Sequence, residues 1–427
     1  MKNLKNLRVY MVSLGCPKNR VDSEKTLAKL SEQGCRVVDD PEDAECLLIN
    51  TCGFIGDARE ESVDTILDLA EYKKKRPGVK LAVMGCMVEL FHDDMAGSMP
   101  EIDILVGLHE EDTIDVQGDG VLDRVLEPGA VAAYLKIAEG CGNSCSFCSI
   151  PLIRGSLRSR SVIDLVKETR GLISNGIKEI SLISQDTTRY GLDLKMKDGL
   201  VTLVRELLKE RPDWLRLHYL YPTFVSDSLI DLVASEPSVC GYFDIPFQHI
   251  DSGILKGMGR QETERDIKEL VEKIRQKAGG AAIRSAFIVG FPGEGEEEFE
   301  RLHDFVRDAK LDHVGIFTYS PETGTSAEKI GETVSEELKE ERKNILMELQ
   351  SGISAEINSA KVGKKFPVLV ERYRDEENLL TGRLMTQGVD IDGEVILDES
   401  DALPGELVEV EITGSMEYDL IGRVVKG

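Results

Sequence analysis

Strand-like and amphipathic helical segments alternate six times between about residues 127 and 330, and this repeat constrains the fold more than any other feature. Successive strand–helix units align their strands in parallel and curl into a barrel. Six units are fewer than a closed eight-unit barrel needs, so we predict an open-sided, partial TIM barrel that a large substrate can enter. The expected strands are 133–139, 179–184, 215–220, 242–245, 282–289 and 313–319.

Different patterns flank this repeat on both sides. Before it, apolar strands near 9–14, 46–50 and 81–84 alternate with helices near 23–33 and 58–75, which predicts a parallel α/β domain. After it, a polar helix over 335–360 leads to five short strands with glycine turns, which predict a small antiparallel β-barrel. The expected domains are 1–126, 127–360 (including the connecting helix) and 361–427. The five short strands are 366–372, 379–383, 394–397, 407–413 and 420–425.

Composition limits the location and the partners of the chain. Its 427 residues carry a formal charge of −26, which disfavours binding of free polyanions and favours a basic partner. No apolar run reaches the roughly 18 residues of a membrane span, and the N-terminus lacks the pattern of a secretory signal. We therefore expect a cytoplasmic protein without a membrane partner. In that compartment the nine cysteines favour metal binding or catalysis over disulfides.

Cys141, Cys145 and Cys148 form the strongest local motif, Cys-x3-Cys-x2-Cys, directly after the first predicted barrel strand. Barrel enzymes carry their chemistry at this end of the strands. Three thiolates in one loop leave one iron of a [4Fe–4S] cluster without a protein ligand, free to bind a chelating substrate. The alternative is a zinc loop, but zinc sites usually need further ligands, and the next cysteine, Cys240, stands alone.

Three further cysteines, Cys16, Cys52 and Cys86, each follow a separate predicted strand of the N-terminal domain. The carboxyl ends of parallel strands open onto one crevice, so these thiols are expected to converge there on a second three-cysteine cluster. The alternative is that they are unrelated buried cysteines. The remaining cysteines fit no such pattern and are expected to be small core residues. They are Cys35, Cys46 and Cys240.

These motifs resemble those of the radical S-adenosylmethionine (SAM) methylthiotransferases, and the resemblance covers essentially the whole chain. It implies a C-terminal TRAM domain and two [4Fe–4S] clusters. The resemblance assigns SAM binding and cleavage to Cys141, Cys145 and Cys148, and an auxiliary cluster that carries the transferred sulfur to Cys16, Cys52 and Cys86. A 5′-deoxyadenosyl radical would then remove hydrogen from the substrate carbon, and an external one-electron reductant is implied. No side chain outside the cysteine sets receives a catalytic role.

Two branches of this family differ in substrate. Local sequences such as Ser13-Leu-Gly-Cys-Pro-Lys-Asn19 and Ser184-Gln-Asp-Thr-Thr188 resemble the RimO type, which modifies the β-carbon of an aspartate in small-subunit ribosomal protein S-twelve. The MiaB type, which modifies an adenosine in tRNA, usually has Gln-Met-Asn after the first cysteine. Residues 363–427 carry 7 basic and 15 acidic side chains, a balance that suits a basic protein, free or on the small ribosomal subunit, better than RNA. The tRNA enzyme remains the main alternative, and a non-enzymatic iron–sulfur or zinc protein is a second one.

Five residues outside the cysteine motifs are candidates for binding SAM. Gln185 and Asp186 end the second barrel strand and are predicted to meet the amino group of the methionine moiety. Gly290 and Glu294 lie in a strand-end turn that the resemblance places beside the adenine, although an ordinary turn explains them nearly as well. Arg154 belongs to a local basic cluster that suits the methionine carboxylate, an acidic substrate or a solvated loop. The histidines at strand ends, His218 and His249, are expected to be structural.

Overall fold

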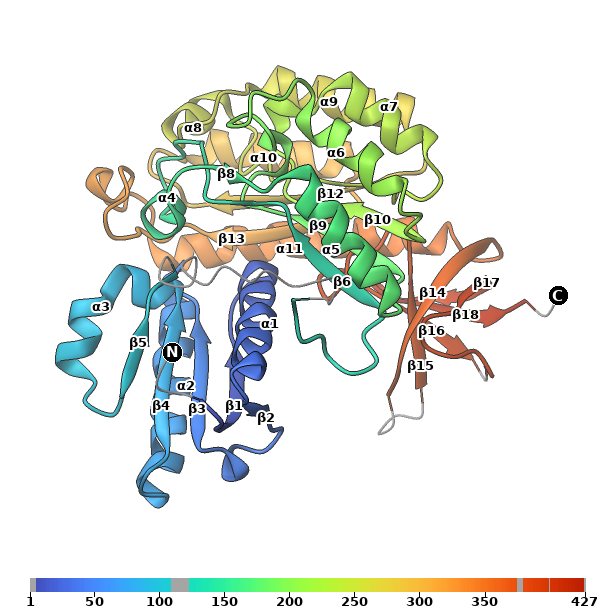
Figure 1. Ribbon diagram of the computed structural model, residues 1–427. Helices are drawn as coiled ribbons and strands as arrows, with labels where there is room; N and C mark the ends of the chain where they lie inside the picture. Colours follow the sequence, from blue (N-terminus) through green and yellow to red (C-terminus); the bar gives the residue numbers. More distant parts are fainter. Residues whose placement is uncertain (1–4, 109–122, 375–378, 399, 426–427) are drawn as a thin grey trace.

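The computed structural model describes residues 5–108, 123–374, 379–398 and 400–425. They form a parallel sheet with its helices, an arched body of strands and helices above it, and a small β-barrel at the end of a long helix (Figure 1). No helix in these four ranges is long and apolar enough to cross a membrane.

The N-terminal body is a five-stranded, all-parallel sheet in the order β2-β1-β3-β4-β5. Its central strand β3 is buried at every position, because apolar clusters cover both faces of the sheet. The strands are β1 (Arg8–Ser13), β2 (Arg36–Val37), β3 (Cys46–Thr51), β4 (Lys80–Gly85) and β5 (Ile104–Val106). The helices are α1 (Pro17–Glu32), the 3-10 turn η1 (Pro41–Asp43), α2 (Gly56–Lys75) and α3 (Cys86–Ser98).

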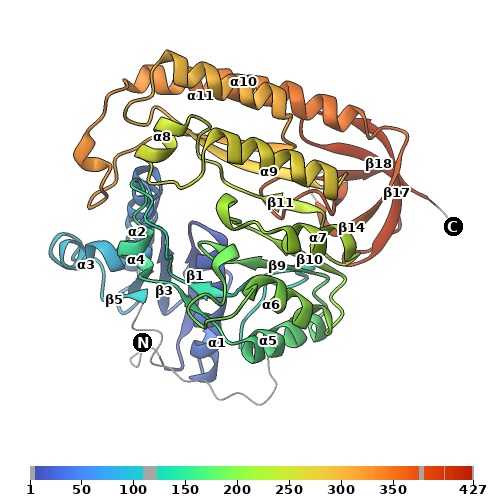
Figure 2. The same ribbon diagram turned by 90° about the horizontal axis from the view of Figure 1, so that it is seen from above.

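The middle body holds six parallel strands that follow one another in space in chain order. They pair as two three-stranded sheets, β10-β9-β6 and β11-β12-β13, and a bridge between Leu215 and Val239 joins the two at β10. Helices cover the outer side (Figure 2), and the arch does not close between β13 and β6. The strands are β6 (Ala132–Lys136), β9 (Glu179–Ile183), β10 (Trp214–Leu217), β11 (Tyr242–Asp244), β12 (Ala282–Val289) and β13 (His313–Thr318). The helices are α5 (Val162–Ser174), α6 (Gly199–Leu208), α7 (Asp227–Ser235), α8 (Ser252–Gly257), α9 (Glu264–Lys277) and α10 (Glu296–Ala309).

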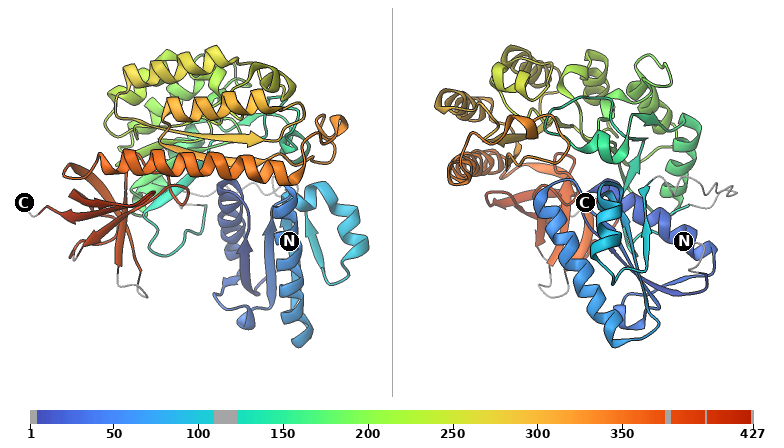
Figure 3. Two further views of the ribbon diagram at one scale, coloured as in Figure 1. Left: turned by 180° about the vertical axis from the view of Figure 1, so that it is seen from behind. Right: turned by 90° about the vertical axis from the view of Figure 1, so that its left-hand side faces the viewer.

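Helix α11 (Glu336–Ser359) runs along β13 from the arch to the C-terminal β-barrel (Figure 3). That barrel is closed in the order β14-β15-β16-β18-β17, and apolar side chains fill its interior. Four of its five strand pairings are antiparallel, as predicted, whereas β16 and β18 pair in parallel. Its strands are β14 (Lys365–Arg374), β15 (Leu379–Leu384), β16 (Val395–Asp398), β17 (Leu407–Ser415) and β18 (Leu420–Val424).

The predicted fold class is confirmed in all three bodies, and the differences are local. Helix α1 begins at Pro17, six residues before its predicted start, because proline suits the first helical position after the extended residue Cys16. Strands β2 and β5 were missed, since edge strands of two or three residues leave no pattern to detect. The strand predicted over 133–139 is divided into β6 and a short β7 (Ala138–Glu139). Two further short elements near the barrel cysteines were missed for the same reason as β2 and β5. They are β8 (Arg158–Ser159) and α4 (Ile150–Arg154).

A buried ionic network fixes the C-terminal barrel against the start of the arch strands. Glu179 at the start of β9 accepts hydrogen bonds from Arg216 Nε of β10, at 2.7 Å, and from Arg383 Nη2 of β15, at 2.8 Å. All three side chains are almost completely buried. Burial alone would raise the pKa of Glu179, but the two guanidinium groups outweigh it and lower this pKa to about 2.

Replacing Glu179 by Gln is expected to lower the free energy of unfolding by about 3–5 kcal/mol, because two buried guanidinium groups lose a shared counter-ion. Urea or thermal unfolding measures the loss. The pKa of Glu179 is lower in the folded state, so its stabilising contribution is complete above the ordinary pKa of 4.5 and is lost as the pH falls toward about 2.

Glu210→Gln is the matched control for this prediction. Glu210 pairs with Arg170 at 2.8 Å, but the Arg170 side chain is 67% exposed, so the change should cost less than about 1 kcal/mol. Equal losses in the two variants would show that the Glu179 network does not hold the two bodies together.

Candidate functional site

The three N-terminal cysteines lie side by side at one edge of the N-terminal sheet. They follow β1, β3 and β4, which are adjacent strands, and Cys16 and Cys86 stand at the starts of α1 and α3. Cys52 and Cys86 are buried and Cys16 is partly buried. The three cysteines therefore lie at the carboxyl ends of three adjacent strands.

Asn19 and a glycine hold this edge together. Asn19 Nδ2 donates to the carbonyl oxygens of Leu14 and Thr51, at 3.0 and 3.1 Å, and its Oδ1 lies 3.5 Å from Cys86 Sγ. Gly15 has φ +88°, and a Cβ there would lie 2.9 Å from the Cβ of Cys52. A side chain at this position would displace Cys52, so the close approach of the two loops requires glycine.

The other three predicted cluster ligands, called the barrel trio, are Cys141, Cys145 and Cys148; Cys16, Cys52 and Cys86 are called the N-terminal trio. The barrel trio lies in one loop between β7 and α4, beyond the carboxyl end of β6. Ser146, inside this loop, donates from its backbone N–H to Met258 O and from its hydroxyl to Gly257 O, both at 2.8 Å. Gly259 has φ +73°, and a Cβ there would lie 2.7 Å from Ser144 O. The turn after α8 thus supports the loop that carries Cys141, Cys145 and Cys148.

Two contacts join the segments that carry the two cysteine trios. The hydroxyl of Ser149, next to Cys148, donates to the carbonyl of Phe54, two residues past Cys52, at 3.4 Å. Arg154 on α4 places its Nη2 3.4 Å from Cys86 Sγ. The structure therefore brings all six predicted cysteines to the junction between the sheet body and the arch.

The chemistry of these thiols suits metal clusters. None of the nine cysteines forms a disulfide, and burial raises the pKa of Cys86 to about 11 and that of Cys148 to about 12. A bound metal would deprotonate them, since a coordinating thiol loses its proton. Among the described residues no group of His, Cys, Asp and Glu gathers closely enough for a single metal ion. Two separate sets of three thiols match clusters that take a thiolate at each of several irons.

A buried cluster of four charges joins α1 to the arch beside the cysteines. Arg154 donates to Glu139 Oε1 at 2.7 Å and to Asp22 Oδ2 at 3.1 Å, while Lys136 pairs with both of these carboxylates. Arg154 is 1% exposed, and the attraction of Asp22 and Glu139 outweighs its burial and raises its pKa. The alternative that Arg154 lies in a solvated loop is wrong, because its side chain is buried. Its guanidinium instead contacts Cys86 of the N-terminal trio.

The other residues predicted to bind SAM divide into two groups. Asp186 lies beside the barrel cysteines, where it accepts a hydrogen bond from Asn143 Nδ2 at 2.7 Å, and burial raises its pKa. Gln185 precedes it and is partly buried. Glu294 instead accepts from Arg342 Nη1 of α11 at 2.7 Å, and the Lys339 side chain packs so tightly on Gly290 that no Cβ would fit.

Both histidines are buried at the ends of arch strands. His218 Nδ1 lies 3.1 Å from Asp244 Oδ2, and His249 Nε2 lies 3.3 Å from Glu294 Oε2. These carboxylates fix the orientation of the two rings, in keeping with the structural role expected for them.

Two features near the trios were missed in the sequence. Lys18 is 6% exposed, burial lowers its pKa to about 8, and its Nζ lies 3.2 Å from the ring centroid of Tyr219. Arg189 donates to Gly142 O at 2.7 Å and to Asn143 Oδ1 at 2.6 Å, inside the loop of the barrel trio. Lys18 could have been identified from the sequence, because it lies in the motif Cys16-Pro-Lys-Asn19. No motif near Arg189 indicates a role in the site.

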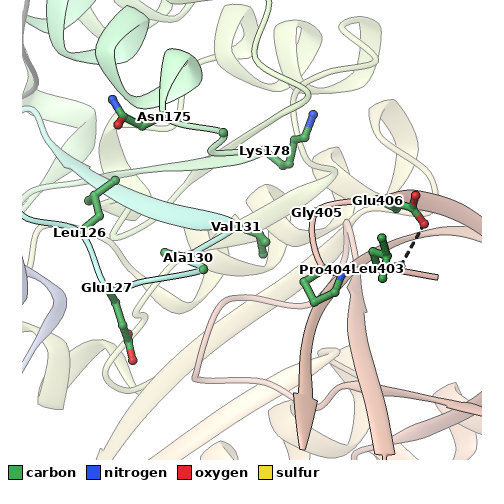
Figure 4. Close-up of a pocket in the computed structure, with 12 residues that line it drawn as sticks. Leu126, Glu127, Ala130, Val131, Asn175, Lys178, Leu403, Pro404, Gly405 and Glu406 are labelled. Carbon is green, nitrogen blue, oxygen red and sulfur yellow. Dashed lines mark hydrogen bonds between the residues drawn. The ribbon is translucent and has the colours of Figure 1, made fainter. Parts of the chain in front are cut away.

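A cavity of about 610 Å³ lies away from the cysteines. It opens before the start of β6, between Leu126–Val131 and the loop that contains Leu403 and Glu406 of the C-terminal barrel (Figure 4). The cysteine loops lie at the opposite end of β6, so this cavity is not part of the candidate site.

Comparison with known proteins first defines the class. The model of the Radical SAM superfamily matches residues 135–306, that of "Uncharacterized protein family UPF0004" residues 8–107, and that of the TRAM domain residues 362–425. A radical SAM methyltransferase structure, TsrM from Kitasatospora setae, shares the fold with TM-score 0.55 at 16% identity, covering 74% of this chain and 77% of its own. The chain is thus a radical SAM enzyme, a class that implies a [4Fe–4S] cluster and SAM as cofactors.

Relatives at higher identity then define the family. The ribosomal protein uS12 methylthiotransferase RimO of Clostridium botulinum is 40% identical over 99% of both chains. The protein with the same name from Geobacter sulfurreducens is 42% identical over the full length of both. The chain belongs to this RimO family of methylthiotransferases.

Replacing Arg154 by Met should destabilise the junction by about 3–5 kcal/mol, because Asp22 and Glu139 would then share only Lys136 as a buried counter-ion. Thermal unfolding and limited proteolysis between the sheet body and the arch measure this. Arg158→Met is the control, since Arg158 is exposed and surface pairs contribute little. If Arg154→Met matched Arg158→Met, the buried charges would not hold the junction.

Proposed function

We propose that this chain transfers a methylthio group to the β-carbon of an aspartate in ribosomal protein uS12, the S-twelve protein of the small subunit. One observation carries the proposal: the segments that carry the two sets of three cysteines are in contact at the junction, in a chain that is at least 40% identical, over its full length, to enzymes named for this reaction. The substrate is cytoplasmic, and so, on this proposal, is the enzyme.

Each trio would hold one [4Fe–4S] cluster through three of its irons and leave the fourth free. We assign the barrel trio to the cluster that binds SAM and the N-terminal trio to the auxiliary cluster. When bound, these groups supply reductive cleavage of SAM, with an electron from an external reductant, and the sulfur that is transferred. We propose three domains: residues 1–126 hold the auxiliary cluster, residues 127–360 form the radical SAM barrel with its connecting helix, and residues 361–427 form the TRAM barrel that binds the substrate.

The chain's own residues position the reactants and exclude water. We assign Asp186 and Gln185 to the amino group of SAM, because Asp186 lies directly against the barrel cysteine loop. We place the turn of Gly290 and Glu294 beside the adenine of SAM. Lys339 packs on Gly290 and Arg342 donates to Glu294, so contacts within the protein fix the shape of this turn. Arg154 is assigned to the auxiliary site, where its charge offsets the negative charge of cluster thiolates.

A basic protein suits this chain better than RNA. The C-terminal barrel exposes Tyr373 and Tyr418, but residues 363–427 carry more than twice as many acidic as basic side chains. Such a surface repels a phosphate backbone and attracts a ribosomal protein. Transfer to a tRNA adenosine is therefore the second candidate, and the charge balance speaks against it.

Single cysteine replacements should separate the two clusters. Cys145→Ala and Cys52→Ala should each lower the iron content of anaerobically reconstituted protein from about eight to about four atoms per chain. Cys145→Ala should abolish 5′-deoxyadenosine formation, whereas Cys52→Ala should keep it and lose methylthio transfer. Iron and sulfide assays, electron paramagnetic resonance and chromatography of the nucleoside product measure these effects.

Cys46→Ala is the control for these replacements, because Cys46 is fully buried within β3 and lies outside both trios. It should retain about eight irons and full activity. Retention of the wild-type iron content in either Cys145→Ala or Cys52→Ala would contradict the assignment of that trio.

Reconstituted enzyme with SAM and a strong reductant should add one methylthio group to uS12, free or within the small subunit. Mass spectrometry of tryptic peptides locates the group, and nucleoside analysis of tRNA from the same reaction should show no change. A modified adenosine with unmodified uS12 would make the second candidate the correct one.

A further inference from the structure

Lys18 is the exception among the buried cations in the described part of the chain. Eight lysine or arginine side chains in the described ranges are at most 9% exposed. Seven of them form an ion pair with at least one carboxylate; these are Arg124, Arg154, Arg216, Arg260, Lys339, Arg342 and Arg383. Lys18 has neither an ion pair nor a hydrogen bond with any described residue, and a buried charge without a partner is costly.

The position of Lys18 is equally unusual. It lies in the first turn of α1, two residues after Cys16, and its Nζ sits 3.2 Å from the centroid of the Tyr219 ring. Tyr219 follows β10 with φ +57°, a left-handed conformation that non-glycine residues adopt rarely and that often marks functional sites. Lys18 thus reaches from the N-terminal trio to the carboxyl end of the arch strands.

The carboxylates in this region already have partners. Asp244 accepts from the backbone N–H of Tyr219 at 3.2 Å and lies 3.1 Å from His218 Nδ1 and 3.3 Å from Arg284 Nη1. Glu139 and Asp22 are held by Arg154 and Lys136, as described above. Among the described residues, Cys16, Asp244 and Glu139 attract the Lys18 charge, but none of them forms an ion pair or a hydrogen bond with it. The Lys18 ammonium is therefore free to bind an external anion.

We propose that Lys18 binds the carboxylate of the substrate aspartate and so positions the adjacent β-carbon beside the N-terminal trio. This inference rests on the proposed function. An aspartate carboxylate is one bond from its β-carbon, and Lys18 is two residues from Cys16, so one ion pair would orient the reacting carbon toward the site of the sulfur. The methionine carboxylate of SAM could also pair with Lys18. However, SAM is assigned to the barrel trio, whereas Lys18 lies beside the N-terminal trio.

The test compares wild type, Lys18→Met, Lys18→Arg and Lys29→Met with two synthetic uS12 peptides, one with the target aspartate and one with asparagine there. Lys29 lies on the same helix about three turns further on, so Lys29→Met is a matched control. Fluorescence anisotropy measures peptide binding without SAM. Steady-state kinetics then give separate KM values for peptide and SAM.

Wild type and Lys29→Met should bind the aspartate peptide about 10- to 100-fold more tightly than the asparagine peptide. Lys18→Met should lose this difference by weakening only the aspartate peptide, and Lys18→Arg should restore part of it. The KM for SAM and the formation of 5′-deoxyadenosine without peptide should stay unchanged. Lys18→Met should also unfold at about the same temperature as wild type, because the loss of the contact with Tyr219 offsets the removal of a buried charge.

Unchanged discrimination between the peptides in Lys18→Met would overturn the proposal. So would a raised KM for SAM with normal peptide binding, which would assign Lys18 to the methionine carboxylate. Failure of wild type to modify uS12 would refute the proposed function instead, and the peptide-binding comparison would still report on Lys18.

Discussion

The buried charge cluster at the junction is the interaction on which the arrangement of the site depends. Asp22 lies on the helix that follows Cys16, and Arg154 lies on the short helix that follows Cys148. Each ion would be costly to bury alone, but together with Lys136 and Glu139 the four charges cancel. Because these partners stand next to the cysteines, satisfying the charges also fixes how the two cysteine loops face each other.

Much of this site could be predicted because it follows from strand ends. Cys16, Cys52 and Cys86 each follow an apolar strand, and parallel strands place such residues at one edge whatever the helices do. The Cys141–Cys148 loop is local in sequence, so its spacing alone brought the three thiols together. The barrel strands were recognisable for a similar reason, since each is a short apolar run between amphipathic helices.

What the sequence did not reveal depends on pairs of residues far apart in the chain. Arg154 and Asp22 are 132 residues apart, so the sequence shows a basic loop but not the carboxylates that bury its arginine. Glu294 and Arg342 are 48 residues apart, and the helix that covers Gly290 begins only at Glu336. The parallel pairing of β16 with β18 closes the C-terminal barrel. The residue pattern of a single strand does not show which strand it pairs with, so this pairing could not be predicted.

The same rule for buried charge explains how each trio is supported. Arg154 lies 3.4 Å from Cys86 Sγ. Burial raises the pKa of Cys145, and the positive charge of Arg260 offsets part of this effect. Both arginines also bind carboxylates, so neither adds a full positive charge while the thiols are neutral. Thiolates that hold a cluster carry negative charge, and a guanidinium beside each trio then stabilises it at little cost to the empty protein.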